Sequence, residues 1–117
     1  MRAVLRSLHL DPDPVGLSDD PADFAFLARL IVGPSVGPGD ECFDVQVCSP
    51  EWLAVRCANE QFVDGRHTVV TTLHSYSEAG LRSFLARRVE NVSGKNWRDV
   101  AEKVGRLGLW EFQDYRQ

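Results

Sequence analysis

The sequence predicts a single α+β domain, residues 1–117, in which a mainly antiparallel β-sheet is covered by about three α-helices. Alternating or β-branched apolar runs at residues 24–32, 43–48 and 67–75 are typical of strands. Apolar stripes with helical spacing occupy residues 81–89 and 97–107. The length of 117 residues and the 44% hydrophobic content suit one globular domain. The expected element order is β-β-β-α-β-α-α-β.

The first three strands are expected before residue 49. Residues 2–10 are apolar-rich and precede a loop at 11–22 that holds three prolines and four aspartates. Residues 24–32 alternate, but their second face is also largely apolar, so a helix is the alternative to a central strand. Residues 33–41 are rich in glycine and proline and form a loop. The alternating run 43–48 then completes a hairpin.

The first helix is expected from Pro50 to about Asn59. Ser49 is a good N-cap, Pro50 suits the first helical position, and Glu51 favours the positive end of the helix dipole. Trp52 is the first apolar residue of this helix. We expect it to pack in the core, like Trp97 at the start of the last helix.

The second half of the chain supplies one strand, two helices and a closing strand. Residues 67–75 predict a strand. The next helix begins with either a capping box from Ser75 to Glu78 or a cap at Ser77. The residues expected on its apolar stripe are Leu81, Phe84, Leu85 and Val89. Asn96 is expected to cap the last helix and Gly108 to end it, before a strand around Trp110.

Charge is distributed unevenly along the chain. The net charge is −4, and residues 1–60 hold ten acidic and four basic residues, or −6, whereas the rest carries +2. An acidic half repels nucleic acid and attracts basic partners, although a solvated acidic surface is the simpler interpretation. No signal peptide or membrane span is recognisable, which predicts a cytoplasmic protein that binds no membrane.

The sequence contains no recognisable catalytic, metal or cofactor motif. The three cysteines form no CxxC pair and the three histidines have no zinc spacing. Glu111 and Asp114 would point to opposite faces of a strand, which disfavours a catalytic pair. Arg82, Arg87 and Arg88 are interpreted as a solvated helix face. We therefore expect a binding protein without cofactor or enzymatic activity, and keep a small hydrolase as the alternative.

Several short stretches together resemble the immunity protein 8 family of bacterial polymorphic toxin systems. They are Ile31-Val32-Gly33-Pro34, Phe43-Asp44-Val45, Ser49-Pro50-x-Trp52-Leu53 and Trp110-Glu111-Phe112-x-x-Tyr115, in that order along nearly the whole chain. The resemblance implies an antitoxin that binds a cognate toxin domain and blocks its active site or substrate path. It provides no catalytic motif and no contact residues.

The acidic half suggests where such a toxin would bind. Many toxins of these systems are basic nucleases, and opposite charge accelerates association with them. The expected contact residues are Asp11, Asp13, Asp19, Asp20, Asp40, Glu41 and Asp44, with a second patch at Glu111, Asp114 and Tyr115. A non-catalytic adaptor or regulatory subunit is the alternative function. An uncovered sheet edge would also allow a homodimer.

Overall fold

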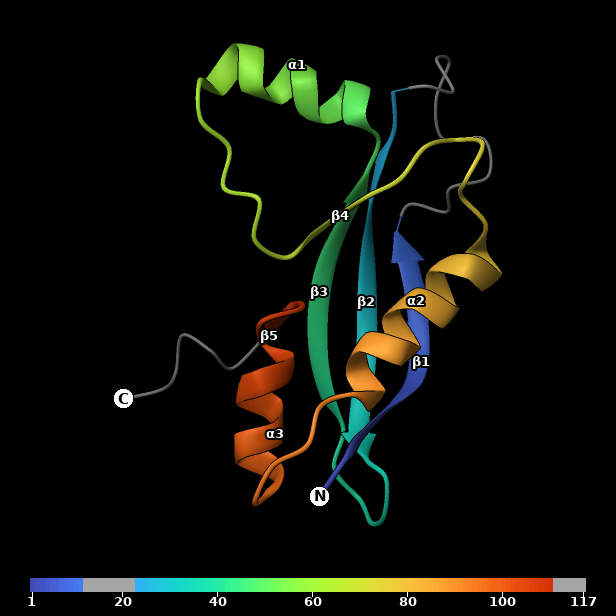
Figure 1. The fold of residues 1–117 in the computed structure, drawn as a ribbon, viewed down its shortest axis with the longest axis vertical. Helices are drawn as coiled ribbons and strands as arrows, with labels where there is room; N and C mark the ends of the chain where they lie inside the picture. Colours follow the sequence, from blue (N-terminus) through green and yellow to red (C-terminus); the bar gives the residue numbers. More distant parts are fainter. Residues whose placement is uncertain (12–22, 111–117) are drawn as a thin grey trace.

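A computed structural model of the chain describes residues 1–11 and 23–110, in which the predicted order of elements is confirmed (Figure 1). The strands are β1 (Ala3–Asp11), β2 (Ala25–Pro34), β3 (Glu41–Cys48), β4 (Thr68–Val70) and β5 (Leu109–Trp110). The helices are α1 (Pro50–Glu60), α2 (Glu78–Glu90) and α3 (Trp97–Val104). The α+β class is therefore confirmed.

The sheet is built on three long antiparallel strands in the order β1-β2-β3. β3 has two short partners along its far edge: β5 pairs antiparallel with Phe43 and Asp44, whereas β4 pairs parallel with residues 46–48. Parallel pairing requires a crossover connection, and α1 with its following loop provides it. The sheet is thus mixed but mainly antiparallel, as predicted.

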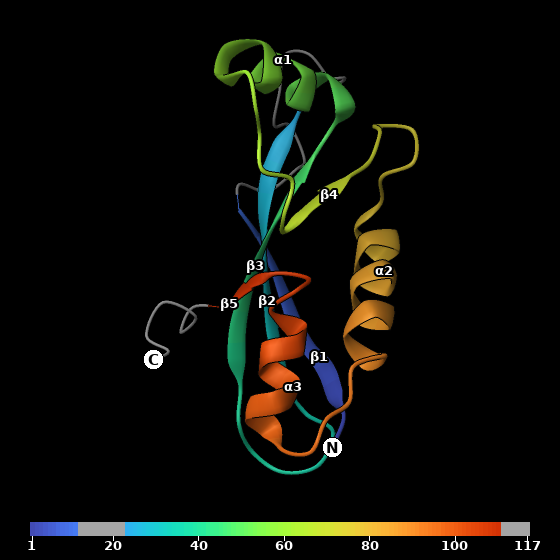
Figure 2. The ribbon, with the colours of Figure 1, turned by 60° about the vertical axis from the view of Figure 1, so that its left-hand side comes forward.

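Only one face of the sheet carries the hydrophobic core. Phe26, Leu30, Phe43, Val45 and Val47 point to this face and are at most 2% exposed. Leu85 and Val89 of α2 and Val100 and Val104 of α3 pack against this face and complete the core. Figure 2 shows both helices on this side of the three long strands. No helix of the described chain covers the opposite face, where Arg29 is exposed and Leu27 and Ile31 are half-buried.

The helix starts follow the capping chemistry of the sequence. Ser49 accepts a hydrogen bond from the Trp52 N–H, and Asn96 accepts one from the Asp99 N–H at 2.9 Å. For α2, the alternative cap at Ser77 is the observed one, with its hydroxyl accepting from Gly80 N–H. Each cap satisfies a backbone donor that the first helical turn leaves without a partner.

The helix α1 lies beyond the end of the sheet and contributes no buried residue (Figure 1). The prediction that Trp52 packs in the core is wrong, because its side chain is only half-buried and stacks under the Arg56 guanidinium, 5.1 Å from the ring centroid. Two helices cover the sheet, and the third projects from it.

Three other sequence expectations need correction. The strand predicted at 67–75 is reduced to Thr68–Val70, because His67 has a positive φ of 58° and hydrogen-bonded turns follow at Thr72. Phe84 is 42% exposed and does not belong to the buried stripe of α2. Gly108 does not end α3, which is capped at Gly105. Gly108 instead allows close approach to β3, since a Cβ there would lie 3.0 Å from Val45 Cγ2.

Candidate partner-binding surface

The acidic residues around the β2–β3 hairpin are engaged within the protein. Asp40 pairs with Arg6 at 2.8 Å, and Asp44 receives two hydrogen bonds from Arg29, at 2.9 and 3.1 Å. Glu41 accepts a hydrogen bond from the Trp110 indole N–H at 3.1 Å. Asp40 and Asp44 are therefore neutralised by arginines, whereas the partner of Glu41 is an uncharged indole N–H.

Asp11 lies at the opposite end of the sheet from the hairpin. It is the last residue of β1, is exposed, and forms no ion pair with another described residue. The other predicted residues of the acidic surface, Asp13, Asp19, Asp20, Glu111, Asp114 and Tyr115, lie outside the described residues. The structure therefore separates Asp11 from Asp40 by the length of the strands instead of bringing them together.

The end of the sheet that carries Asp11 also carries α1 (Figure 1). Asp23 precedes β2 at this end, and Glu51 lies in the first turn of α1. No ion pair links either carboxylate to the described part of the chain, in contrast to Asp40 and Asp44. Unpaired carboxylates produce a stronger external field than paired ones, which makes Asp23 and Glu51 candidates for contact with a basic partner.

Apolar side chains are exposed at the same end. Val55 on α1 is 53% exposed, and Phe62, which follows α1 directly, is 85% exposed. Val70 at the end of β4 is 48% exposed and is paired with Cys48, one residue before the cap of α1. Exposed apolar groups beside charged ones mark interaction sites more often than scattered single residues do. The sequence contained one signal for this site, since Phe62 is a large apolar residue in a polar loop.

Ser49 fixes α1 to the sheet. Its hydroxyl accepts hydrogen bonds from the Phe24 N–H at 3.1 Å and the Trp52 N–H at 3.2 Å, and its own N–H donates to Phe24 O at 2.9 Å. The side chain is 1% exposed. One buried residue thus joins the start of β2 to the start of α1, which sets the position of the exposed surface relative to the core.

Cys48, directly before the cap of α1, is a buried free thiol. Burial raises the pKa of the Cys48 thiol, an effect that the nearby Arg56 only partly offsets, so this thiol stays protonated. Cys57 is exposed on α1. Residues 1–11 and 23–110 contain no group of three or more His, Cys, Asp and Glu side chains that could hold a metal ion. None of the helices described is long and apolar enough to cross a membrane.

A pocket that the sequence did not predict lies between the start of β4 and the C-terminal ends of α2 and α3. It has a volume of about 750 Å³, and basic residues from three separate segments line it, among them Arg66, Arg88 and Arg106. The sequence predicts Arg88 on a solvated helix face with Arg82 and Arg87. Nothing in the sequence indicated that α3 and β4 bring further basic residues to Arg88, because that depends on tertiary packing.

Comparison with protein families gives a match over nearly the whole chain. Neither a curated protein nor a solved structure matches the chain. The model of one protein family, immunity protein 8, matches residues 3–115, which is nearly the whole length. These residues contain all the strands and helices described above, as well as the end of the sheet that carries α1. The chain therefore belongs to the immunity protein 8 family.

Proposed function

We propose that this immunity protein neutralises a cognate bacterial toxin by binding it through the α1 end of the sheet, without catalysing a reaction. We define the α1 end by Asp11, Asp23, Glu51, Val55 and Phe62. The observation that supports this proposal is the coincidence of unpaired carboxylates with strongly exposed apolar side chains at one end of the fold. Membership of the immunity protein 8 family supports the role in toxin neutralisation. The geometry of the α1 end supports the location of the contact surface.

The two kinds of side chain at the α1 end have different tasks in such a complex. Carboxylates accelerate the association with a basic toxin, such as a nuclease with a cationic cleft, and disfavour other partners. Phe62 and Val55 supply the apolar contacts that slow dissociation, since a few buried anchors contribute most of the affinity of an interface. Asp13, Asp19 and Asp20 lie in sequence between Asp11 and Asp23, and we include them in the proposed surface.

The bound immunity protein would occlude the active site or substrate path of the toxin. A cleft that binds nucleic acid attracts carboxylates for the same reason that it attracts phosphates. The hairpin acids Asp40, Glu41 and Asp44 are assigned a structural role in this proposal because their partners lie within the protein. The C-terminal residues Glu111, Asp114 and Tyr115 stay a second predicted patch.

The test uses the toxin domain encoded beside this gene. Calorimetry over a range of salt concentrations measures affinity, and growth of cells that express both proteins measures protection. Phe62→Ala should weaken binding about tenfold or more, as expected for an interface anchor. Val36→Ala is the matched control, because Val36 is 84% exposed but lies in the hairpin at the opposite end. Neither substitution should alter thermal stability.

The charge component is tested with the double variant Asp11→Asn and Asp23→Asn. We expect slower association at low salt and little change at high salt, where screening removes the steering. Equal losses from Phe62→Ala and Val36→Ala would refute the proposed location. A lack of both binding and protection would refute the proposed function. Sedimentation of the free chain and the complex gives the stoichiometry and tests the predicted homodimer.

A further inference from the structure

The basic pocket begins at Gly65, three residues after Phe62, but shares none of the five residues that define the α1 end. Arg66 and His67 line it from the start of β4, Arg88 lines it from α2, and Lys103 and Arg106 line it from the end of α3. None of its described lining residues is acidic. A pocket with four cationic side chains in a chain of net charge −4 is a local reversal of the overall charge.

Two of the four cations are neutralised by carboxylates outside the pocket. Arg66 pairs with Asp64 at 2.6 Å, and the hydrogen bonds from Arg66 lower the pKa of Asp64 from 3.8 to about 2. Lys103 lies 3.4 Å from Asp99 and donates a hydrogen bond to Ser93 O. Arg88 and Arg106 form no ion pair with any carboxylate of the described chain. Their guanidinium groups supply the net positive charge of the pocket.

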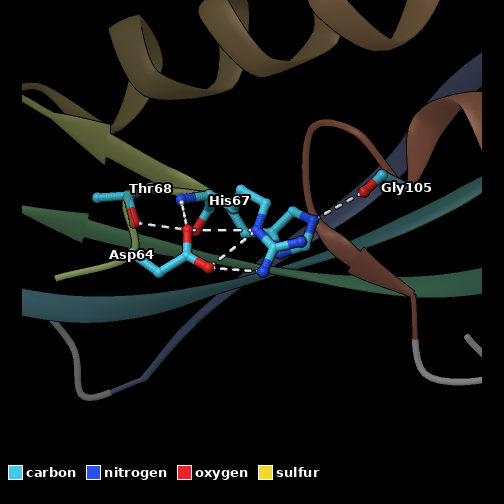
Figure 3. Close-up of polar contacts among 5 residues, drawn as sticks. Asp64, His67, Thr68 and Gly105 are labelled. Carbon is cyan, nitrogen blue, oxygen red and sulfur yellow. Dashed lines mark hydrogen bonds and ion pairs between the residues drawn. The ribbon is translucent and has the colours of Figure 1, made fainter. Parts of the chain in front are cut away.

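The wall of the pocket at β4 is fixed by a strained residue. His67 adopts a positive φ of 58°, which is unfavourable for a residue with a side chain. Its Nε2–H donates to Gly105 O at 2.8 Å and so attaches the loop before β4 to the C-cap of α3 (Figure 3). The wall is therefore preformed. Strain of this kind is found preferentially at ligand and active sites.

We propose that this pocket binds a small anion that carries a di- or triphosphate, as in a nucleoside diphosphate or triphosphate. Arg guanidinium groups match phosphate oxygens with paired hydrogen bonds. Arg88 lies over the Phe84 ring, 5.2 Å from its centroid, a contact that leaves its N–H groups free to bind an anion, and Arg106 has no carboxylate partner in the described chain. The pocket volume lies in the range of small-molecule sites. A ligand with a single carboxylate would pair with only one guanidinium. A di- or triphosphate carries several negative charges and can pair with more than one cation of the pocket.

The experiment uses the full chain with pyrophosphate, ATP and adenosine as probes. Pyrophosphate and ATP should shift the NMR signals of residues 65–69, 88–93 and 103–107, and adenosine should shift none of them. The double variant Arg88→Gln and Arg106→Gln should weaken pyrophosphate binding at least roughly tenfold in calorimetry. Arg82→Gln, on the same helix but outside the pocket, is the matched control and should leave the affinity unchanged.

Three results would overturn the proposal. One is the absence of any shift of the wild-type pocket signals at millimolar pyrophosphate, which would leave these cations the simpler role of complementing the ends of α2 and α3. Another is an equal loss of affinity in the Arg82→Gln control. The third is binding of an acidic peptide at this site without binding of pyrophosphate. Each result is independent of whether the chain binds a toxin.

Discussion

Ser49 forms two side-chain hydrogen bonds where its sequence position predicts one. Capping of α1 follows from local sequence, because Ser49 is followed by Pro50 and Glu51. The second bond, from Phe24 N–H, joins residues 25 positions apart and depends on the hairpin between them. The cap bond from Trp52 N–H thus explains only part of the need for serine at this position. The bond from Phe24 N–H, which forms only in the folded chain, explains why the hydroxyl is buried.

Replacing Ser49 by alanine should lower the free energy of unfolding by roughly 2–3 kcal/mol, from the loss of the cap and from a buried Phe24 N–H that has no acceptor. The control is Ser77→Ala, which removes the exposed cap of α2 and should cost only about 1 kcal/mol. Urea unfolding measures both values. Equal costs in the two variants would show that the Phe24 bond contributes nothing.

Gly33, in the stretch Ile31-Val32-Gly33-Pro34, is needed because no side chain fits at this position. It is buried in β2, and a Cβ there would collide with the Arg6 side chain. That side chain crosses Gly33 to donate hydrogen bonds to Pro34 O at 2.6 Å and Gly37 O at 3.1 Å, and it pairs with Asp40. The glycine therefore provides the space through which one arginine organises the hairpin. The sequence showed the motif but not the arginine, which comes from the bulged region of β1.

At the scale of elements, the sequence predicted what is local and failed where tertiary contacts decide. The predicted N-caps at Ser49 and Asn96 and the hairpin were correct, and Ser77 was one of two alternatives for α2, because capping and alternation act over a few residues. The strand predicted at 67–75 was too long, because β-branched composition does not show that His67 turns the chain. The position of α1 was not predictable either. Trp52 and Leu53 are apolar and suggest a helix packed on the core, but α1 lies beyond the end of the sheet and has no buried residue.

The pairing of β5 with β3 depends on close contact at Gly108. A Cβ at this position would lie 3.0 Å from Val45 Cγ2 and 3.2 Å from Asp44 O. Gly108→Ala should therefore destabilise the protein by about 1–3 kcal/mol, because backbone on one side cannot move away freely. Gly65→Ala is the control, since no atom lies within 4 Å of its added Cβ, and it should change stability by about 0.5 kcal/mol or less. Thermal unfolding of both variants distinguishes a specific contact from a general effect of glycine replacement.

The whole molecule divides into a packed body and a projecting end. The body consists of the long strands with α2 and α3 and contains the one described core cluster, whereas α1 contributes no buried residue. Such an arrangement separates stability from binding. Substitutions on α1 can change the proposed contact surface without removing core contacts, and the basic pocket lies in the body, where α2, α3 and β4 meet.

This division predicts an order of local stability that hydrogen exchange can measure. Amides of α1 should exchange faster than those of β2, β3 and α2, because opening α1 exposes little apolar surface that is buried in the native state. Leu85→Ala, in the core, should cost about 2–5 kcal/mol and accelerate exchange throughout the body. Val55→Ala, on α1, should change stability by about 0.5 kcal/mol or less. If α1 amides exchanged as slowly as those of β3, the helix would be coupled to the core, and toxin contacts at the α1 end would no longer be separable from folding.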